Sequence, residues 1–437
     1  MWDAVLNIEM SQATAMYVSA VALIGIFFEF HRVWSLRNLD LMALLFYAPG
    51  VLWFVGGFAP WGHAWLLIVS SYFLVRLLLD QVVTRRPLVE PNLSPAGLIF
   101  TAVVLLVILS IGMMIKPLST SDFPDPRAIL AAGENGKAAV SSTGGNDAIL
   151  DADASWGAID QDPSADTLHP PGHPFLHTIA HRGGEPFIPG VETEKVMGRA
   201  ILRAIAKRTI ALLGLFALLA GMLLIGGLFF RSWTIGLSAV TIYLLLPYSA
   251  RTIDYVDHIL PAAALVWAVM LYRWPFWAGV LIGFAAGLIF FPVFLLPLWF
   301  VFYGKWELNR RFLGGFVVVF GLLAAVLALG PDFGRHLAAM LGATTLLPEQ
   351  PMGFWLLHGE LFRWAMLVGF LALVVVVARR TSHAVGSLIC GCATLMLAVQ
   401  FWHPYDGGTY LAWFMPLLLL TVLRPNLPSV AEDEARN

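Results

Sequence analysis

Apolar stretches of about 20 residues recur along the chain, and short polar turns separate them. A helix of about 20 apolar residues can cross the ~30 Å hydrocarbon core of a bilayer, where it satisfies its own backbone hydrogen bonds. The alternation of apolar and polar positions that is typical of an outer-membrane barrel is absent from the sequence. The pattern therefore predicts an all-α polytopic membrane protein with about 13 transmembrane helices.

The expected spans lie on both sides of one long polar segment, Pro117–Arg199, which holds twelve Asp and Glu against five Lys and Arg. Four spans precede it, at about 13–30, 41–58, 65–79 and 96–115. Nine follow it, at about 209–230, 233–249, 259–271, 277–289, 291–303, 312–329, 361–378, 384–402 and 409–423. We divide the chain into an N-terminal three-span segment (1–93), a membrane core with a large loop at 117–199 (94–424), and a polar tail (425–437).

Three local patterns add to this outline. Phe290-Phe-Pro292 divides two short apolar segments, and proline there predicts a broken helix. Ala59–Ala64 has no Lys or Arg, so we expect an outer turn there. Glu194–Arg208 carries basic residues before an apolar span, which predicts an amphipathic helix lying on the outer membrane surface.

The positions of Lys and Arg orient the chain. Short cytoplasmic loops of membrane proteins are enriched in these residues. Arg32, Arg85, Lys305 and Arg380 all fall in alternate connections, which we therefore place in the cytoplasm. We expect an integral, multi-pass protein of a bacterial plasma membrane, with the N-terminus and Pro117–Arg199 outside and the C-terminus inside.

Composition agrees with this class and excludes others. Charged residues make up 12% of the chain and hydrophobic residues 59%, whereas a soluble domain has about 25% charged residues. The net charge of −2 indicates no nucleic-acid partner. Cys390 and Cys392 lie inside one apolar run, where their spacing directs them to different sides of a helix, so we expect buried thiols without a disulfide.

The first cluster with candidate chemistry follows the fourth span, where Asp122 and Asp125 flank a Phe-Pro pair. A carboxylate at the membrane interface has a low local dielectric, which favours a general base. Asp before Pro is also common at helix starts and turns, so a purely structural role stays open.

The second cluster lies further along the same loop, where His169, His173, His177 and His181 repeat every four residues. Histidines at this spacing share one helix face and resemble half of a zinc site. No glutamate completes a known motif, so we expect no metal site. A face that hydrogen-bonds phosphate or sugar, or a solvated face, stays open.

Three further clusters fall in turns that the orientation places outside. One holds Arg251, Asp254, Asp257 and His258, where an Arg251–Asp254 pair could be structural. Another holds His403 and Asp406 before the last span. The last holds Asp332, Arg335, His336, Glu349, His358 and Glu360, where arginine would suit a phosphate. Ionisable residues near a membrane are usually functional, although an interfacial position weakens that argument.

The order of these elements resembles the GT-C superfamily of membrane glycosyltransferases, which use polyprenyl-phosphate sugars, over about Ser94–Leu423. Asp122-Phe-Pro-Asp125 through Gly133 looks like the acidic opening of that family's large outer loop, and His169-Pro-Pro-Gly-His-Pro looks like a stretch of the same loop. Arg251–His258 stands where members carry an acidic residue between two spans. The Gly-rich stretch Ala278–Gly287 with Phe291-Pro292 looks like the family's glycine-rich helix and break, with Ile289 or Phe290 in place of the usual lysine, as in a diverged, mannosyltransferase-like member.

The resemblance implies an inverting hexosyltransferase of the cell envelope that needs no cofactor, with a divalent cation as an option. Asp122 is then the first choice of catalytic base, followed by Asp125, and Asp257 orients the acceptor or binds a cation. Substrate-binding residues would be Asp254, Arg251, His258, His169, His173, His177, His403 and Asp406. The partners would be a polyprenyl-phosphate sugar donor, a lipid or glycan acceptor, and membrane lipids. A transporter or flippase for a lipid-linked or anionic substrate, and a non-catalytic membrane protein, remain alternatives.

Overall fold

The chain is described by a computed structural model, which covers residues 12–80, 82, 90–115, 192–328, 333–347, 354–355, 359–405 and 407–425. Every regular element in these residues is a helix. This agrees with the all-α class that the apolar pattern predicts.

Five helices are long and apolar enough to cross a membrane: α5 (Ala59–Leu78), α6 (Pro95–Ile115), Ile205–Phe229, α16 (Trp306–Leu327) and α20 (Glu360–Arg380). The segment Ile205–Phe229 belongs to α10 (Glu192–Leu224) and the π-helix η4 (Ile225–Phe229) that continues it. Most side chains of α6 and α16 are not buried by the rest of the protein, and these side chains are largely apolar. Such faces suit contact with lipid, so the chain is a membrane-embedded protein.

The other helices of the described part are shorter. They are α2 (Gln12–Phe27), α3 (Leu36–Leu45), α4 (Tyr47–Val55), α11 (Trp233–Leu245), α12 (Ser249–Thr252), α13 (Val256–Met270), α14 (Pro275–Ile289), α15 (Leu296–Tyr303), α17 (Phe333–Met340), α18 (Ala343–Leu346), α21 (Val385–Val399) and α22 (Met415–Leu423), with the 3-10 helices η5 (Phe291–Leu295) and η6 (Leu411–Trp413). The count of about 13 spans stays a prediction, because several of these helices are shorter than a bilayer core.

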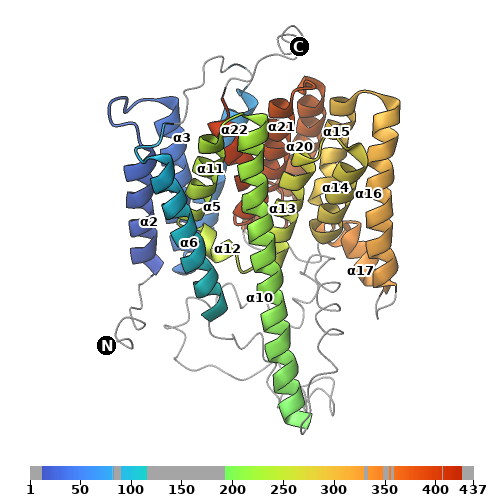
Figure 1. Cartoon of the computed structure of the whole chain (residues 1–437). Coiled ribbons are helices and arrows are strands. Elements are labelled where there is room, and N and C mark those ends of the chain that lie inside the picture. Colours follow the sequence, from blue (N-terminus) through green and yellow to red (C-terminus); the bar gives the residue numbers. More distant parts are fainter. Residues whose placement is uncertain are drawn as a thin grey trace.

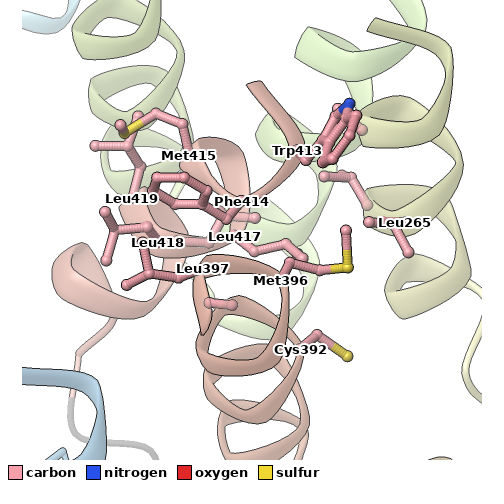
Figure 2. Close-up of a cluster of buried hydrophobic side chains, with 14 of the residues drawn as sticks. Leu265, Cys392, Met396, Leu397, Trp413, Phe414, Met415, Leu417, Leu418 and Leu419 are labelled. Carbon is pink, nitrogen blue, oxygen red and sulfur yellow. The ribbon is translucent and has the colours of Figure 1, made fainter. Parts of the chain in front are cut away.

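The long helices lie side by side in one bundle (Figure 1). α13 packs between α10 and α14, and α21 packs against both α22 and α5. Side chains of α13, α21, η6 and α22 belong to one buried apolar cluster, which includes Leu265, Met396, Trp413 and Leu418 (Figure 2). Cys390 and Cys392 are both buried, as their place in an apolar run predicts.

Glycines set the distance between α14 and α16. A Cβ atom at Gly279 would lie 1.9 Å from the carbonyl oxygen of Phe312, and one at Gly315 would lie 2.0 Å from that of Phe276. The two backbones therefore touch, as in other membrane helix pairs with small residues at the contact. Gly283, one turn on, also faces the backbone of α16. The glycine-rich stretch thus has a clear packing role.

The predicted break at Phe290-Phe-Pro292 is confirmed. α14 ends at Ile289, and Phe290 takes a positive φ of 59° that few non-glycine residues adopt. The chain then reverses through η5 into α15, whose last residue, Tyr303, donates its hydroxyl to the carbonyl of Tyr272 before α14, at 2.7 Å. α14 and α15 are therefore a hairpin that begins and ends at the same side of the bundle.

Two local predictions were wrong. The expected outer turn at Ala59–Ala64 is the first part of α5, because Pro60 occupies the first turn, where its missing N–H leaves no bond unmade. The expected surface helix at Glu194–Arg208 is continuous with the following span in the single helix α10. Figure 1 shows α10 projecting past the other helices at its N-terminal end. The basic residues therefore lie in the N-terminal part of one long helix.

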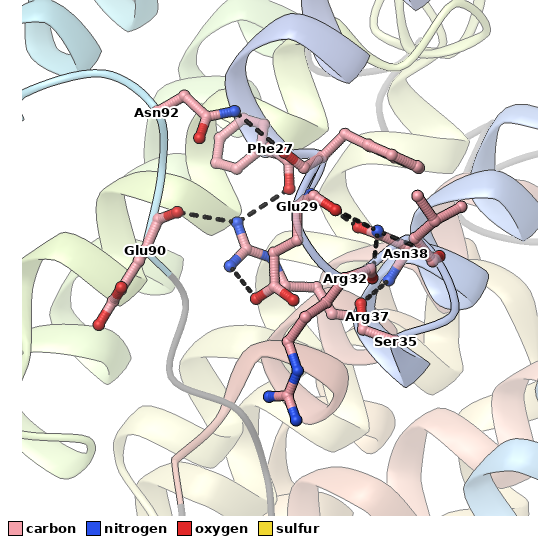
Figure 3. A network of polar contacts seen from close by, with 10 residues as sticks. Phe27, Glu29, Arg32, Ser35, Arg37, Asn38, Glu90 and Asn92 are labelled. Atoms are coloured by element: carbon pink, nitrogen blue, oxygen red, sulfur yellow. Dashed lines mark hydrogen bonds and ion pairs between the residues drawn. The ribbon is translucent and has the colours of Figure 1, made fainter.

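Buried hydrogen bonds hold the connection between α2 and α3. Arg37 forms an ion pair with Glu29 at 3.0 Å and donates to the carbonyls of Phe27 and Glu90 (Figure 3). The Asn38 side chain donates to the carbonyls of Glu29, Arg32 and Val33. This network, which we call the α2–α3 clamp, satisfies the backbone of a tight turn.

A second set of charges lies beside it and joins three elements. Arg76 of α5 contacts Asp40 of α3 at 3.1 Å and Asp80 at 3.6 Å. Asp80 also pairs with Arg424 at the end of α22, and Tyr72 donates to Asp40 at 2.8 Å. Asp40 and Asp80 are almost fully buried, at 2% and 1% exposed. We call these four charged residues the ion-pair cluster.

Candidate functional site

The site is built around the start of α13. α11 ends at Leu245, and a short turn with α12 leads to Tyr255, the N-cap residue of α13. Asp257 stands in the first turn of α13, where the helix dipole stabilises a carboxylate. Asp254 lies just before the helix, and both carboxylates are half-buried. The predicted acidic turn between two helices is therefore present.

This end of α13 lies beside the end of α6 and the middle of α10. Val256 packs with Met113 of α6 and Ala211 of α10 in one small apolar cluster. Arg208 of α10 donates to the carbonyl of Met114 at 3.1 Å, one residue before α6 ends. The start of α13 thus lies next to the end of α6, after which the long polar segment follows in the sequence.

The connection between α21 and α22 covers the same end. After α21 ends at Val399, the chain forms turns through His403 and Gly407 and re-enters a helix at η6. The indole N–H of Trp413 in η6 donates to the backbone carbonyl of Asp257 at 3.2 Å. This bond fixes the α21–α22 connection against the start of α13, across 156 residues of sequence.

Five rings meet at this junction, and we call them the ring cluster: His258, Phe291, His403, Tyr410 and Trp413. The ring of Tyr410 stacks on those of His258 and Trp413, with ring centroids 5.5 and 4.4 Å apart. The ring centroid of His403 lies 4.4 Å from that of Tyr410 and 5.0 Å from that of Phe291, the first residue of η5. Two clusters that the sequence placed in separate turns are therefore in direct contact.

The ring cluster is buried but polar. His258 is 6% exposed and His403 is 4% exposed. Nδ1 of His258 has no hydrogen-bond partner among the described residues, and neither does the side-chain nitrogen of Gln400, just before the cluster. Buried polar atoms normally find a partner, so each exception needs an explanation, and a ligand is one. Aromatic faces with a few fixed polar groups are typical of small-molecule sites.

A buried cation lies in the neighbouring helix. Arg363, one turn into α20, is 1% exposed and donates to the carbonyls of Thr345 and Leu346 at 3.4 and 3.1 Å. Its Nε has no partner among the described residues, and its guanidinium lies over the ring of Trp364. The phenol of Tyr405, in the α21–α22 connection, lies within electrostatic range of the guanidinium. Arg363 therefore places a positive charge at the same end of the bundle.

The structure describes only part of the predicted site. Asp254, Asp257, His258 and His403 are described, and all four belong to the two connections that meet here. Arg251 is in α12, but its side chain is outside the described part. Asp122, Asp125, His169, His173, His177 and Asp406 lie outside the described residues. Among the described residues, no group of three His, Cys, Asp or Glu could hold a metal ion.

Sequence reasoning missed Phe291, Trp413 and Arg363. Phe291 and Trp413 stand inside apolar runs, where an aromatic residue is normally core. Arg363 could have been found more easily than the two aromatic residues, because an arginine inside an apolar helix is costly unless it has a role or a partner. It follows Glu360 by three residues, at the edge of the predicted fifth cluster.

Comparison with protein-family models, with curated proteins and with solved structures found no match for this chain.

Proposed function

We propose that the protein is an inverting membrane glycosyltransferase that moves a sugar from a polyprenyl-phosphate donor to an acceptor on the extracytoplasmic side. One observation carries the proposal: the turn with Asp257 and His258 contacts the turn with His403 and Tyr410, next to the end of α6, after which the long polar segment follows in the sequence. Residues with suitable chemistry from distant parts of the chain thus share one end of the bundle. The resemblance in motif order supports the same function.

The reaction needs a base, an oriented acceptor and a stabilised leaving group. The acceptor oxygen attacks the anomeric carbon, its proton passes to a carboxylate, and the bond from that carbon to the phosphate oxygen breaks. Asp122 is our first choice for the base and Asp125 the second. Asp257 orients the acceptor, or binds a cation if one takes part. The ring cluster offers aromatic faces to a sugar or an isoprenoid chain.

The departing lipid phosphate needs cationic or hydrogen-bonding groups. Arg363 suits this role, because guanidinium is the preferred partner of phosphate and its Nε has no partner among the described residues. Arg251 and His173 would add to it, with the neutral imidazoles of His169 and His177 as further donors. Asp254 and Asp406 would bind sugar hydroxyls.

A transporter or flippase is the main alternative. Transporters bind their substrates near the middle of the membrane, at interrupted helices. In the described part, Asp257 and Arg363 stand in the first turns of their helices, and Arg76 and Arg424 of the ion-pair cluster stand at the C-terminal ends of α5 and α22. Charges at the ends of the bundle favour an enzyme that works at one membrane surface.

The test is transfer of radiolabelled sugar from polyprenyl-phosphate donors by the full-length protein in proteoliposomes. Asp122→Asn should abolish transfer, since loss of a general base lowers a rate by about 10²–10⁴-fold, and Asp257→Asn should impair it strongly. Asp147→Asn and His31→Ala are matched controls that should leave the rate unchanged. Labelled lipid that crosses the bilayer without transfer of its sugar would establish the transport alternative.

A further inference from the structure

The α21–α22 connection carries His403 and Tyr410, and a tight turn shapes it. A Cβ atom at Gly407 would lie 2.3 Å from the carbonyl oxygen of Gln400, so the chain returns directly onto the end of α21. Gly408 has a φ of +99° and donates its N–H to Oε1 of Gln400 at 3.0 Å. Both positions need glycine, because a side chain would clash at the first and strain the backbone at the second.

A helix from the other end of the sequence supports this turn. His63 lies in the second turn of α5 and is 1% exposed, and its Nδ1 contacts the carbonyl oxygen of Gly407 at 3.3 Å. Because a carbonyl only accepts, Nδ1 of His63 carries the proton and donates it. Leu66, on the same face of α5, lies against Gly408. The contact joins residues 344 positions apart.

We propose that His63 is a positioning residue of the ring cluster, acting through the Gly407 carbonyl to hold His403 and Tyr410 against His258. The effect of His63 on sugar transfer rests on the proposed function, whereas its contact with Gly407 does not. A buried imidazole in an apolar helix is costly unless it is hydrogen-bonded. This one bonds to the turn that carries His403 and Tyr410. The N-terminal three-span segment would then be part of the catalytic unit.

Two isosteric substitutions separate positioning from simple packing. The amide nitrogen of Asn can take the place of Nδ1, whereas the longer Gln places its amide near the position of Nε2. His63→Asn should therefore keep the bond to Gly407, and His63→Gln should lose it. Ser70→Ala is the control, because Ser70 is also buried in α5 but contacts Tyr47 at 3.1 Å, away from the turn.

The first readout is hydrogen exchange of the peptide that spans 400–410, measured on the full-length protein in lipid nanodiscs. His63→Gln should raise exchange at Gly408–Tyr410 by about tenfold or more over the wild type, while His63→Asn and Ser70→Ala stay within twofold. Equal exchange in His63→Gln and the wild type would overturn the proposal, whether or not the protein transfers sugar. Failure of both polar His63 variants to fold would also overturn it, since that outcome indicates a stabilising role alone.

The second readout is the transfer assay. His63→Gln should lower kcat by up to ~10²-fold with little change in KM, as expected when a reacting arrangement is displaced by about 1 Å, and His63→Asn should recover most of it. A wild-type protein that transfers no sugar, together with the expected exchange pattern, would refute the proposed function and leave the positioning role standing. The expected exchange pattern with equal kcat in all variants would refute a role of this contact in transfer.

Discussion

The two ends of the bundle bury polar side chains in opposite ways. The ion-pair cluster sets Arg76 and Arg424 against Asp40 and Asp80, so that each charge faces an opposite one. The ring cluster contains no charge pair, and it leaves a buried nitrogen of His258 without a partner among the described residues. Opposite charges that neutralise each other suit a contact between helices that stays intact. Buried atoms without a hydrogen-bond partner among the described residues occur in both clusters, for example Nη1 of Arg76 and Nδ1 of His258, so the charge pairing is what distinguishes the two.

The largest effect should come from breaking the ion-pair cluster. Arg76→Met leaves Asp40 and Asp80 buried without their common cation, which should reduce the free energy of unfolding by about 3–5 kcal/mol. Equilibrium unfolding in detergent micelles would measure it. Adding Asp40→Asn to Arg76→Met should recover much of the loss, because Asp80 keeps its pair with Arg424 and no uncompensated acid remains. A loss below about 1 kcal/mol in Arg76→Met would mean that the cluster is hydrated.

A smaller loss of stability is expected at the ring cluster. Tyr410→Leu removes stacking on His258 and Trp413, each pair being worth about 0.5–1.5 kcal/mol, so the free energy of unfolding should fall by about 1–3 kcal/mol. Tyr410→Phe keeps the ring and is the matched control, which should unfold like the wild type. Comparable losses in the two variants would show that the hydroxyl, and not the stacked ring, matters.

A substitution at His258 should leave the free energy of unfolding unchanged or raise it, unlike the two changes above. His258→Phe keeps a ring between Tyr255 and Tyr410 but removes a buried nitrogen that has no partner among the described residues, so the free energy of unfolding should stay constant or rise by about 1 kcal/mol. Sugar transfer should nevertheless fall. A variant that is clearly less stable than the wild type would mean that the imidazole is satisfied in the folded protein, and the contrast between the two ends would weaken.

The smallest effect should appear at a charge pair outside both clusters. Glu307 and Arg311 contact each other at 2.6 Å but are 72% and 62% exposed. Glu307→Gln should change the free energy of unfolding by less than about 0.5 kcal/mol, because water screens such pairs. The same unfolding measurement would detect a larger change in the free energy of unfolding. Such a change would show that pairing of opposite charges stabilises this protein even without burial.

The sequence predicted those features that depend on local chemistry. Pro292 marked the broken helix, the apolar runs marked α6 and α20, and the acidic turn around Asp257 was found where expected. Each of these follows from neighbouring residues.

The wrong predictions arose where one local pattern is compatible with two structures. Pro60 is typical of a turn but equally suits a first helical turn, so the sequence placed His63 in a turn and gave no sign of its contact with Gly407. The basic residues before Thr209 fit a surface helix as well as the first part of a longer helix. The contact between His258 and Tyr410 depends on packing across 152 positions (410 − 258), which no local pattern encodes.

The length of α10 has a geometric consequence. The helix has 33 residues, which span about 50 Å at 1.5 Å per residue. The hydrocarbon core of a bilayer is only ~30 Å thick. A helix of this length that crosses a bilayer leaves about 20 Å of continuous helix outside the hydrocarbon core. The N-terminal end, which projects past the other helices in Figure 1, is long enough to reach beyond the headgroups.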